Sequence, residues 1–85
     1  MNEDKSNPVW KSYENQDGEY EGYFKVDTLI QHGLGVCIDT KQDTVYEGWL
    51  VRNKKEIYGR LIYKHGLIYQ GEFRNNLPDG RGRLW

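Results

Sequence analysis

Tyr46-Glu47-Gly48-Trp49-Leu50 is the stretch that decides the fold, because two variants of it occur elsewhere in the chain. The variants are Tyr20-Glu21-Gly22-Tyr23-Phe24 and Tyr69-Gln70-Gly71-Glu72-Phe73. A polar spacer and a second glycine follow each stretch, at Gly35, Gly59 and Gly82. A unit that recurs roughly every 20 to 50 residues indicates a repeat protein. We therefore predict repeats over residues 20–45, 46–68 and 69–85, a half-repeat over about 9–19, and a polar arm without regular structure over 1–8.

Each repeat predicts one β-hairpin. The stretch itself alternates between two kinds of residue, and a period of two is the signature of a strand. The segment that begins at the second glycine alternates as well. Polar tips are expected between the two strands, at residues 25–32, 51–57 and 74–79, where Asn, Asp, Gly and Pro favour turns. The first repeat carries two extra residues, which we place within residues 25–32.

The alternation separates the predicted sheet into two faces. Face A collects residues that are almost all uncharged: Tyr20, Gly22, Phe24, Gly35, Cys37, Tyr46, Gly48, Leu50, Gly59, Leu61, Tyr63, Tyr69, Gly71, Phe73, Gly82 and Leu84. Face B mixes charged and apolar residues: Glu21, Tyr23, Lys25, Val36, Glu47, Trp49, Arg60, Ile62, Gln70, Glu72, Arg74, Arg81, Arg83 and Trp85.

The composition gives the glycines of face A a role. The chain has 10 glycines and 12 aromatic residues but no alanine, which argues against a helical bundle. An aromatic ring that lies over a glycine of the next strand shields the backbone and lets the sheet bend. We therefore predict an all-β fold, a single-layer twisted antiparallel meander of hairpins with a concave aromatic and glycine face. Its structural glycines are Gly22, Gly35, Gly48, Gly59, Gly71 and Gly82.

These repeats resemble the MORN repeat (membrane occupation and recognition nexus). Its pattern is approximately Tyr-Glu-Gly-x-Trp/Phe, a short spacer, Gly-x-Gly and an aromatic strand, and the resemblance covers about residues 17–85. The chain departs from it at Leu50, which replaces an aromatic residue, at Ile57, which replaces the first glycine of Gly-x-Gly, and at Gln70, which replaces Glu. The resemblance implies a single-layer meander of hairpins. It also implies non-catalytic roles in scaffolding, protein–protein contact and, in some members, lipid association.

The aromatic row of face A is the first candidate site. One reading is that the rings are simply the core of the sheet, packed on its glycines. The other is that a single layer leaves them partly exposed, over roughly 300–500 Å², which is enough to mark an interface. A trough of this kind suits an amphipathic helix or an extended peptide. The predicted partner-binding residues are Tyr20, Phe24, Tyr46, Leu50, Tyr63, Tyr69 and Phe73.

Basic residues form the second candidate site. The total formal charge is −1, but residues 1–51 carry a charge of −6 and residues 52–85 a charge of +5. Possible contacts with an anionic surface are Arg52, Lys54, Lys55, Arg74, Arg81 and Arg83. The simpler reading is a solvated rim; the functional one is contact with an acidic partner or with anionic headgroups, each basic residue contributing about 1 kcal/mol. The negative total charge argues against nucleic acid as the ligand.

Catalytic and metal sites are not expected. Cys37 with His32 or His65 lacks a visible orienting group, so we interpret Cys37 as a small strand residue. One cysteine and two histidines are too few for a structural zinc site of Cys and His ligands. Glu21 and Glu47 recur with the fold and are interpreted as structural. No cofactor is expected, and the polar N-terminus does not resemble a secretory signal.

The sequence thus favours a non-catalytic interaction module, a small subunit of a larger protein assembly. We expect an intracellular location, with the cytoskeleton, a cilium or a flagellum suggested by the family resemblance. The strand Arg81–Trp85 is expected to be covered by another chain or to pair with one, because exposed strand edges invite pairing. The alternative is a peripheral membrane protein that binds anionic phospholipid through its basic C-terminal half.

Overall fold

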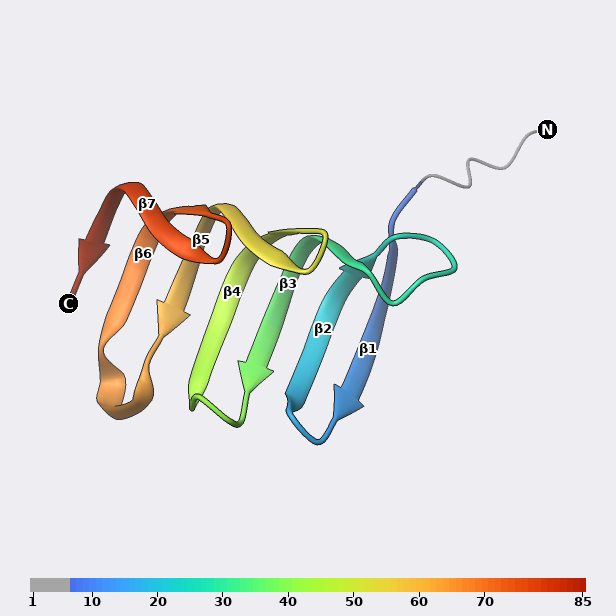
Figure 1. Cartoon of the computed structure of the whole chain (residues 1–85), viewed down its shortest axis with the longest axis horizontal. Coiled ribbons are helices and arrows are strands. Elements are labelled where there is room, and N and C mark those ends of the chain that lie inside the picture. The colour runs from blue at the N-terminus through green and yellow to red at the C-terminus, as the bar shows by residue number, and fades with distance from the viewer. Residues whose placement is uncertain (1–6) are drawn as a thin grey trace.

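The computed structural model describes residues 7–85, so that residues 1–6 of the predicted arm lie outside the described part. Residues 7–85 form one antiparallel sheet whose seven strands follow one another in chain order (Figure 1). The strands are β1 (Val9–Asn15), β2 (Gly18–Phe24), β3 (Gln31–Asp39), β4 (Thr44–Val51), β5 (Lys54–Ile62), β6 (Ile68–Arg74) and β7 (Leu77–Leu84), with a 3-10 turn η1 (Lys64–Gly66) between β5 and β6. The predicted single-layer all-β meander is confirmed.

Two of the hairpin tips are shorter than the sequence suggested. Arg52-Asn53 and Asn75-Asn76 are two-residue turns between flanking strands, and all four residues have positive φ, between 48° and 74°. Two successive residues with φ above zero make the turn that matches the twist of a hairpin. The first tip is longer, and residues 25–30 hold the extra residues as predicted.

Six glycines form a continuous line across the sheet. Gly22 pairs with Gly35, and the register continues strand by strand to Gly82. The ring of Tyr20 lies over Gly35, so that a Cβ added to this glycine would be 2.5 Å from the Cε1 of the ring. The ring of Tyr46 lies over Gly59 in the same way. The third ring and glycine are Tyr69 and Gly82. The predicted packing of ring on glycine therefore occurs once in each repeat.

The tyrosine hydroxyls have a second function at an irregularity that all three hairpins share. The register shifts after Gly22, Gly48 and Gly71, so that two residues on one strand face four on the other. Next to each shift a tyrosine hydroxyl donates a hydrogen bond to the carbonyl three residues later. The bonds are Tyr20 to Tyr23 at 2.8 Å, Tyr46 to Trp49 at 2.7 Å and Tyr69 to Glu72 at 2.9 Å.

An asparagine in each two-residue turn ties its hairpin to the preceding one. The side chain of Asn53 accepts a hydrogen bond from the N–H of Gln31, and the N–H of Asn53 donates to the carbonyl of Gln31. The side chain and N–H of Asn76 make the same two bonds with Lys55. Pro78 occupies the equivalent position on β7, because it pairs with Phe73 as Lys55 pairs with Leu50.

The buried apolar side chains of the described residues all belong to face A. They are Tyr20, Phe24, Tyr46, Leu50, Leu61 and Phe73. The rings meet edge to face, as in Tyr20 with Phe24 at 5.0 Å and Tyr46 with Phe73 at 5.1 Å between centroids. The tips fold toward this core through their asparagines, which helps a one-layer sheet bury its own side chains.

Candidate functional site

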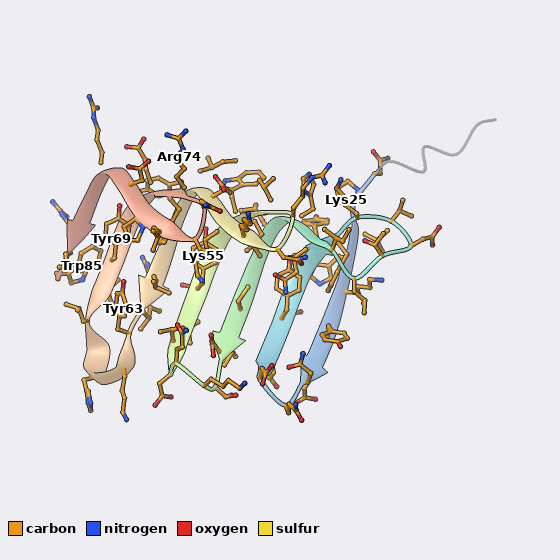
Figure 2. The ribbon with its side chains drawn as sticks, viewed as in Figure 1. Lys25, Lys55, Tyr63, Tyr69, Arg74 and Trp85 are labelled. Carbon is orange, nitrogen blue, oxygen red and sulfur yellow. The ribbon has the colours of Figure 1, made fainter. Side chains whose placement is uncertain are left out.

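The structure places five of the seven predicted partner-binding residues inside the core. Tyr20, Phe24, Tyr46, Leu50 and Phe73 are only 1–3% exposed. The sequence analysis expected these side chains to line an open trough, but in the folded chain they are covered. The other two, Tyr63 and Tyr69, are half-buried and pack against the core (Figure 2). The interpretation of the rings as core therefore accounts for five positions.

A groove does remain on face A. It has a volume of about 390 Å³, and strands β1 to β5 contribute to its lining. Tyr20, Cys37 and Tyr46 lie at its floor, while Tyr13 and Leu29 are exposed side chains at its sides. Polar residues complete the lining: Asn15, Asp17, Glu19, Gln31, Asp39, Lys41, Gln42, Thr44, Asn53, Lys55 and Asn76. The groove thus has an aromatic floor and a polar rim.

Two lysines lie over aromatic rings of face A. The Nζ of Lys11 is 5.0 Å from the centroid of the Phe24 ring, and the Nζ of Lys55 is 5.5 Å from that of Tyr46. A cation over a ring face is attracted by the negative face of the π system. At the opposite end of the groove, Asp17 forms an exposed ion pair with Lys41 at 3.2 Å, and Asp39 lies nearby in the lining.

Burial disfavours ionisation of the groove floor. It raises the pKa of the Cys37 thiol to about 11, an effect that Lys55 opposes and Asp39 reinforces. Burial likewise raises the pKa of Tyr20 to about 12 and that of Tyr46 above its ordinary range. A thiol with a raised pKa is a poor nucleophile at neutral pH, because the thiolate is the reactive form.

No catalytic or metal-binding arrangement is found among residues 7–85. His32 is five residues from Cys37 on the same strand, a separation of about 17 Å. Its Nδ1 accepts a hydrogen bond from the N–H of Arg52 at 3.4 Å. Within the described range no three His, Cys, Asp or Glu residues are placed to hold a metal ion. No helix within this range is long and apolar enough to cross a membrane.

The predicted anionic-surface residues lie in two separate parts of the structure. Arg52, Lys54, Lys55 and Arg74 gather at the edge formed by the hairpin tips, where Lys25 also lies (Figure 2). Arg81 and Arg83 lie along β7 instead. Arg74 is within 3.9 Å of Asp79, in an exposed ion pair.

Face B carries an exposed apolar surface that the sequence analysis did not single out. Trp10, Tyr23, Leu34, Trp49 and Tyr58, which we call the aromatic row, are 37–51% exposed. Trp10 and Tyr23 meet edge to face at 5.1 Å. The alternation in the sequence places Tyr23 and Trp49 on this face, but it does not predict that they are the more exposed rings.

A second apolar line crosses face B nearer the opposite ends of the strands. It consists of Ile38, Val45, Ile62, Ile68 and Trp85, which we call the aliphatic row. The first four are cross-strand neighbours, and the backbone of Trp85 exchanges two hydrogen bonds with that of Ile68. A charged row lies between the two apolar rows: Glu21, Val36, Glu47, Arg60, Gln70 and Arg83.

Comparison with known proteins gives no further assignment. No protein-family model matches the chain, and none of the curated proteins matches it. The MORN resemblance therefore remains a prediction from the repeat pattern.

Proposed function

We propose that this chain is a non-catalytic protein-interaction module of the MORN type that receives a helix or an extended segment of a partner in the groove of face A. The observation that supports this function is the groove itself, where the exposed side chains of Tyr13 and Leu29 stand among polar lining residues. Apolar surface surrounded by polar groups is the usual arrangement of a peptide-binding site. In this proposal the chain is a small subunit of a larger intracellular assembly, with the cytoskeleton or a cilium as the setting suggested by the family resemblance.

The contacts in this proposal differ from those expected from the sequence alone. Tyr13 and Leu29 are exposed at the groove, whereas Tyr46 is buried and supports the sheet. Replacing Tyr46 by a small residue would remove a buried ring of the core, so that a loss of binding could not be distinguished from a loss of structure. The charges of the groove lining favour a partner with acidic groups near Lys55 and with basic groups near Asp39.

A peptide-display selection tests the proposal. The full chain is used to select peptides from a library, and their affinity is measured by fluorescence anisotropy. Tyr13→Asp and Leu29→Asp should each weaken binding at least about tenfold, because a carboxylate in an apolar contact must lose its hydration. Leu77→Asp is the matched control, since Leu77 is exposed and lies outside the groove. Unchanged affinity in both groove variants, with the sheet intact by circular dichroism, would exclude the groove.

Binding to anionic phospholipid is a second candidate, supported by the basic residues at the hairpin tips. Lys54→Glu with Arg74→Glu should reduce pelleting with phosphatidylserine vesicles at low salt, by about fivefold for each charge. Lys64→Glu carries the same change in η1, away from the tips, and serves as the control. Equal losses in all variants would point to net charge rather than to the tip edge.

A further inference from the structure

We propose that face B is the self-association surface of this protein, and that two copies pack face to face as a β-sandwich. This inference is independent of the groove on face A. It begins from exposed area. Four aromatic side chains of the aromatic row and Trp85 together leave on the order of 400 Å² of apolar surface in solvent. A patch of that size on a monomer commonly marks an interface.

The charged row identifies the occupant as a second copy. It is acidic on β2 and β4 at Glu21 and Glu47, and basic on β5 and β7 at Arg60 and Arg83. Among the described residues, none of these four side chains forms an ion pair. Arg60 instead donates to the Oε1 of Gln70 from two nitrogens at 3.3 Å. A second copy whose strands run across the sheet in the reverse order therefore presents basic residues to the acidic ones of the first copy.

One two-fold axis brings these charges together. A second copy turned by 180° about an axis parallel to the strands, between β4 and β5, places β4 over β5, β3 over β6 and β2 over β7. Glu47 then lies opposite Arg60 of the second copy. Glu21 lies opposite Arg83 of the second copy. An axis perpendicular to the strands would instead place each strand over itself, with Glu21 against Glu21, which like-charge repulsion disfavours.

The same axis also matches the apolar rows. Ile38 lies opposite Ile68 of the second copy, and Val45 opposite Ile62. In the aromatic row, Trp49 lies opposite Tyr58. Two sheets packed with nearly aligned strands are the usual form of a β-sandwich. Six spacings between the seven strands span about 29 Å, and strands of seven to nine residues are about 25 Å long. A standard interface takes about 800 Å² from each partner, so that the dimer would use most of face B.

Charge reversal at Glu21 and Arg83 tests the inference. These residues lie on β2 and β7, about 24 Å apart in one chain, so that coupling between them must be intermolecular. Sedimentation velocity over a concentration series should show a dimer for the natural chain. Glu21→Arg and Arg83→Glu should each weaken dimerisation about a hundredfold, because the symmetry repeats each repulsive contact twice.

Mixing the two variants gives the decisive measurement. A Glu21→Arg chain with an Arg83→Glu chain restores opposite charges at both contacts, so that native mass spectrometry should detect a heterodimer. Lys54→Glu, which changes a charge at the hairpin tips, should leave association unchanged. A natural chain that remains monomeric throughout would overturn the inference, as would a dimer indifferent to both reversals. Neither result bears on peptide binding in the groove.

Discussion

At the scale of single residues, the sheet depends on a tyrosine that performs two tasks. The ring of Tyr46 covers Gly59, and its hydroxyl donates to the carbonyl of Trp49 at the register shift. A register shift leaves ladder groups without their usual partners, and a buried carbonyl without a partner costs about 1–3 kcal/mol. The hydroxyl is therefore as much a part of the repeat as the ring.

Replacing Tyr46 by Phe separates the two tasks. We expect Tyr46→Phe to lower the free energy of unfolding by about 1–3 kcal/mol, since the ring remains but the carbonyl of Trp49 loses its donor. Urea unfolding followed by tryptophan fluorescence measures this loss. Tyr58→Phe is the control, because the exposed hydroxyl of Tyr58 contacts only the side chain of Gln70. Equal stability of the natural chain and Tyr46→Phe would refute the role of the hydroxyl.

Ile57 stands where the other repeats have a glycine with positive φ. Gly33 has φ of 125° and Gly80 of 93°, whereas Ile57 is held at 69°. The left-handed region is unfavourable for a β-branched residue. We expect Ile57→Gly to stabilise the protein by about 0.5–1 kcal/mol, after subtracting the backbone entropy of glycine.

Two matched variants, at Ile57 and at the equivalent Gly80, should not share the stability gain of Ile57→Gly. Ile57→Ala keeps the unfavourable φ and should give no comparable gain. Gly80→Ala introduces the same strain and should destabilise β7. Thermal unfolding of the three variants side by side provides the measurement, and a stabilising Gly80→Ala would contradict the explanation.

The raised pKa values predict a loss of stability in alkali. The folded chain keeps the protons of Cys37 and Tyr20 up to pKa values of about 11 and 12, while the ordinary values are 9.0 and 10.0. Above the ordinary values the unfolded chain loses protons first, so stability is complete below pH 9.0 and falls as pH rises toward 12. Urea midpoints across this range test the prediction. In Cys37→Ala the decline should begin about one pH unit higher.

At the scale of the hairpin, each two-residue turn is joined to the preceding hairpin by hydrogen bonds of its asparagine. Asn76 supplies both a left-handed backbone and a side-chain acceptor for Lys55. We expect Asn76→Gly to cost about 1 kcal/mol through the lost hydrogen bond, and Asn76→Ala to cost more because alanine also disfavours the positive φ. Unfolding by urea ranks the two variants. Asn75→Gly keeps the backbone N–H that donates to Glu56 and should be close to neutral.

The hairpins themselves could be predicted from the sequence, because the repeated alternation of Tyr, Gly and Phe specifies strands and their inner face. The ends of the strands could not. The sequence predicts a tip over residues 51–57 that includes Ile57, whereas β5 already begins at Lys54. A residue with positive φ inside a strand has no reliable signal in one sequence. The bonds of Asn53 and Asn76 to the preceding unit were missed for the same reason, although the two asparagines are 23 residues apart, like the later glycines.

At the scale of the whole molecule, every strong contact is between consecutive strands. Stability in such a structure is close to a sum of unit and neighbour terms. We expect native-state hydrogen exchange to be slowest in β4 and β5, which have neighbours on both sides and carry the Tyr46–Gly59 packing. Amides of β1 and β7 should exchange first, since each of these strands pairs on one side only. Uniform protection across all strands would show instead that the sheet opens as one unit.

The choice of exposed face could not be predicted from the sequence. The sequence analysis expected face A to leave rings in solvent, because a flat layer cannot cover itself. The tips fold onto this face, so that Phe24 and Phe73 are buried. Most aromatic side chains left in solvent, Trp10 and Trp49 among them, belong to face B, whereas Tyr13 is exposed on face A. Exposure of a single layer thus depends on the curvature of its loops, which alternation alone does not specify.

Pro78 prevents another hairpin from stacking on β7 in the way that the earlier hairpins stack on one another. In the two earlier positions, Gln31 and Lys55 offer an N–H to the asparagine of the following turn. Proline has no N–H to offer, so a further hairpin stacked on β7 would lack the hydrogen bond from this position to the asparagine of its turn. The edge strand of each earlier hairpin can thus bind the turn of a following hairpin, whereas the edge strand that contains Pro78 cannot, so that the series of stacked hairpins terminates there. The same missing donor protects this part of the outer strand against runaway edge-to-edge growth.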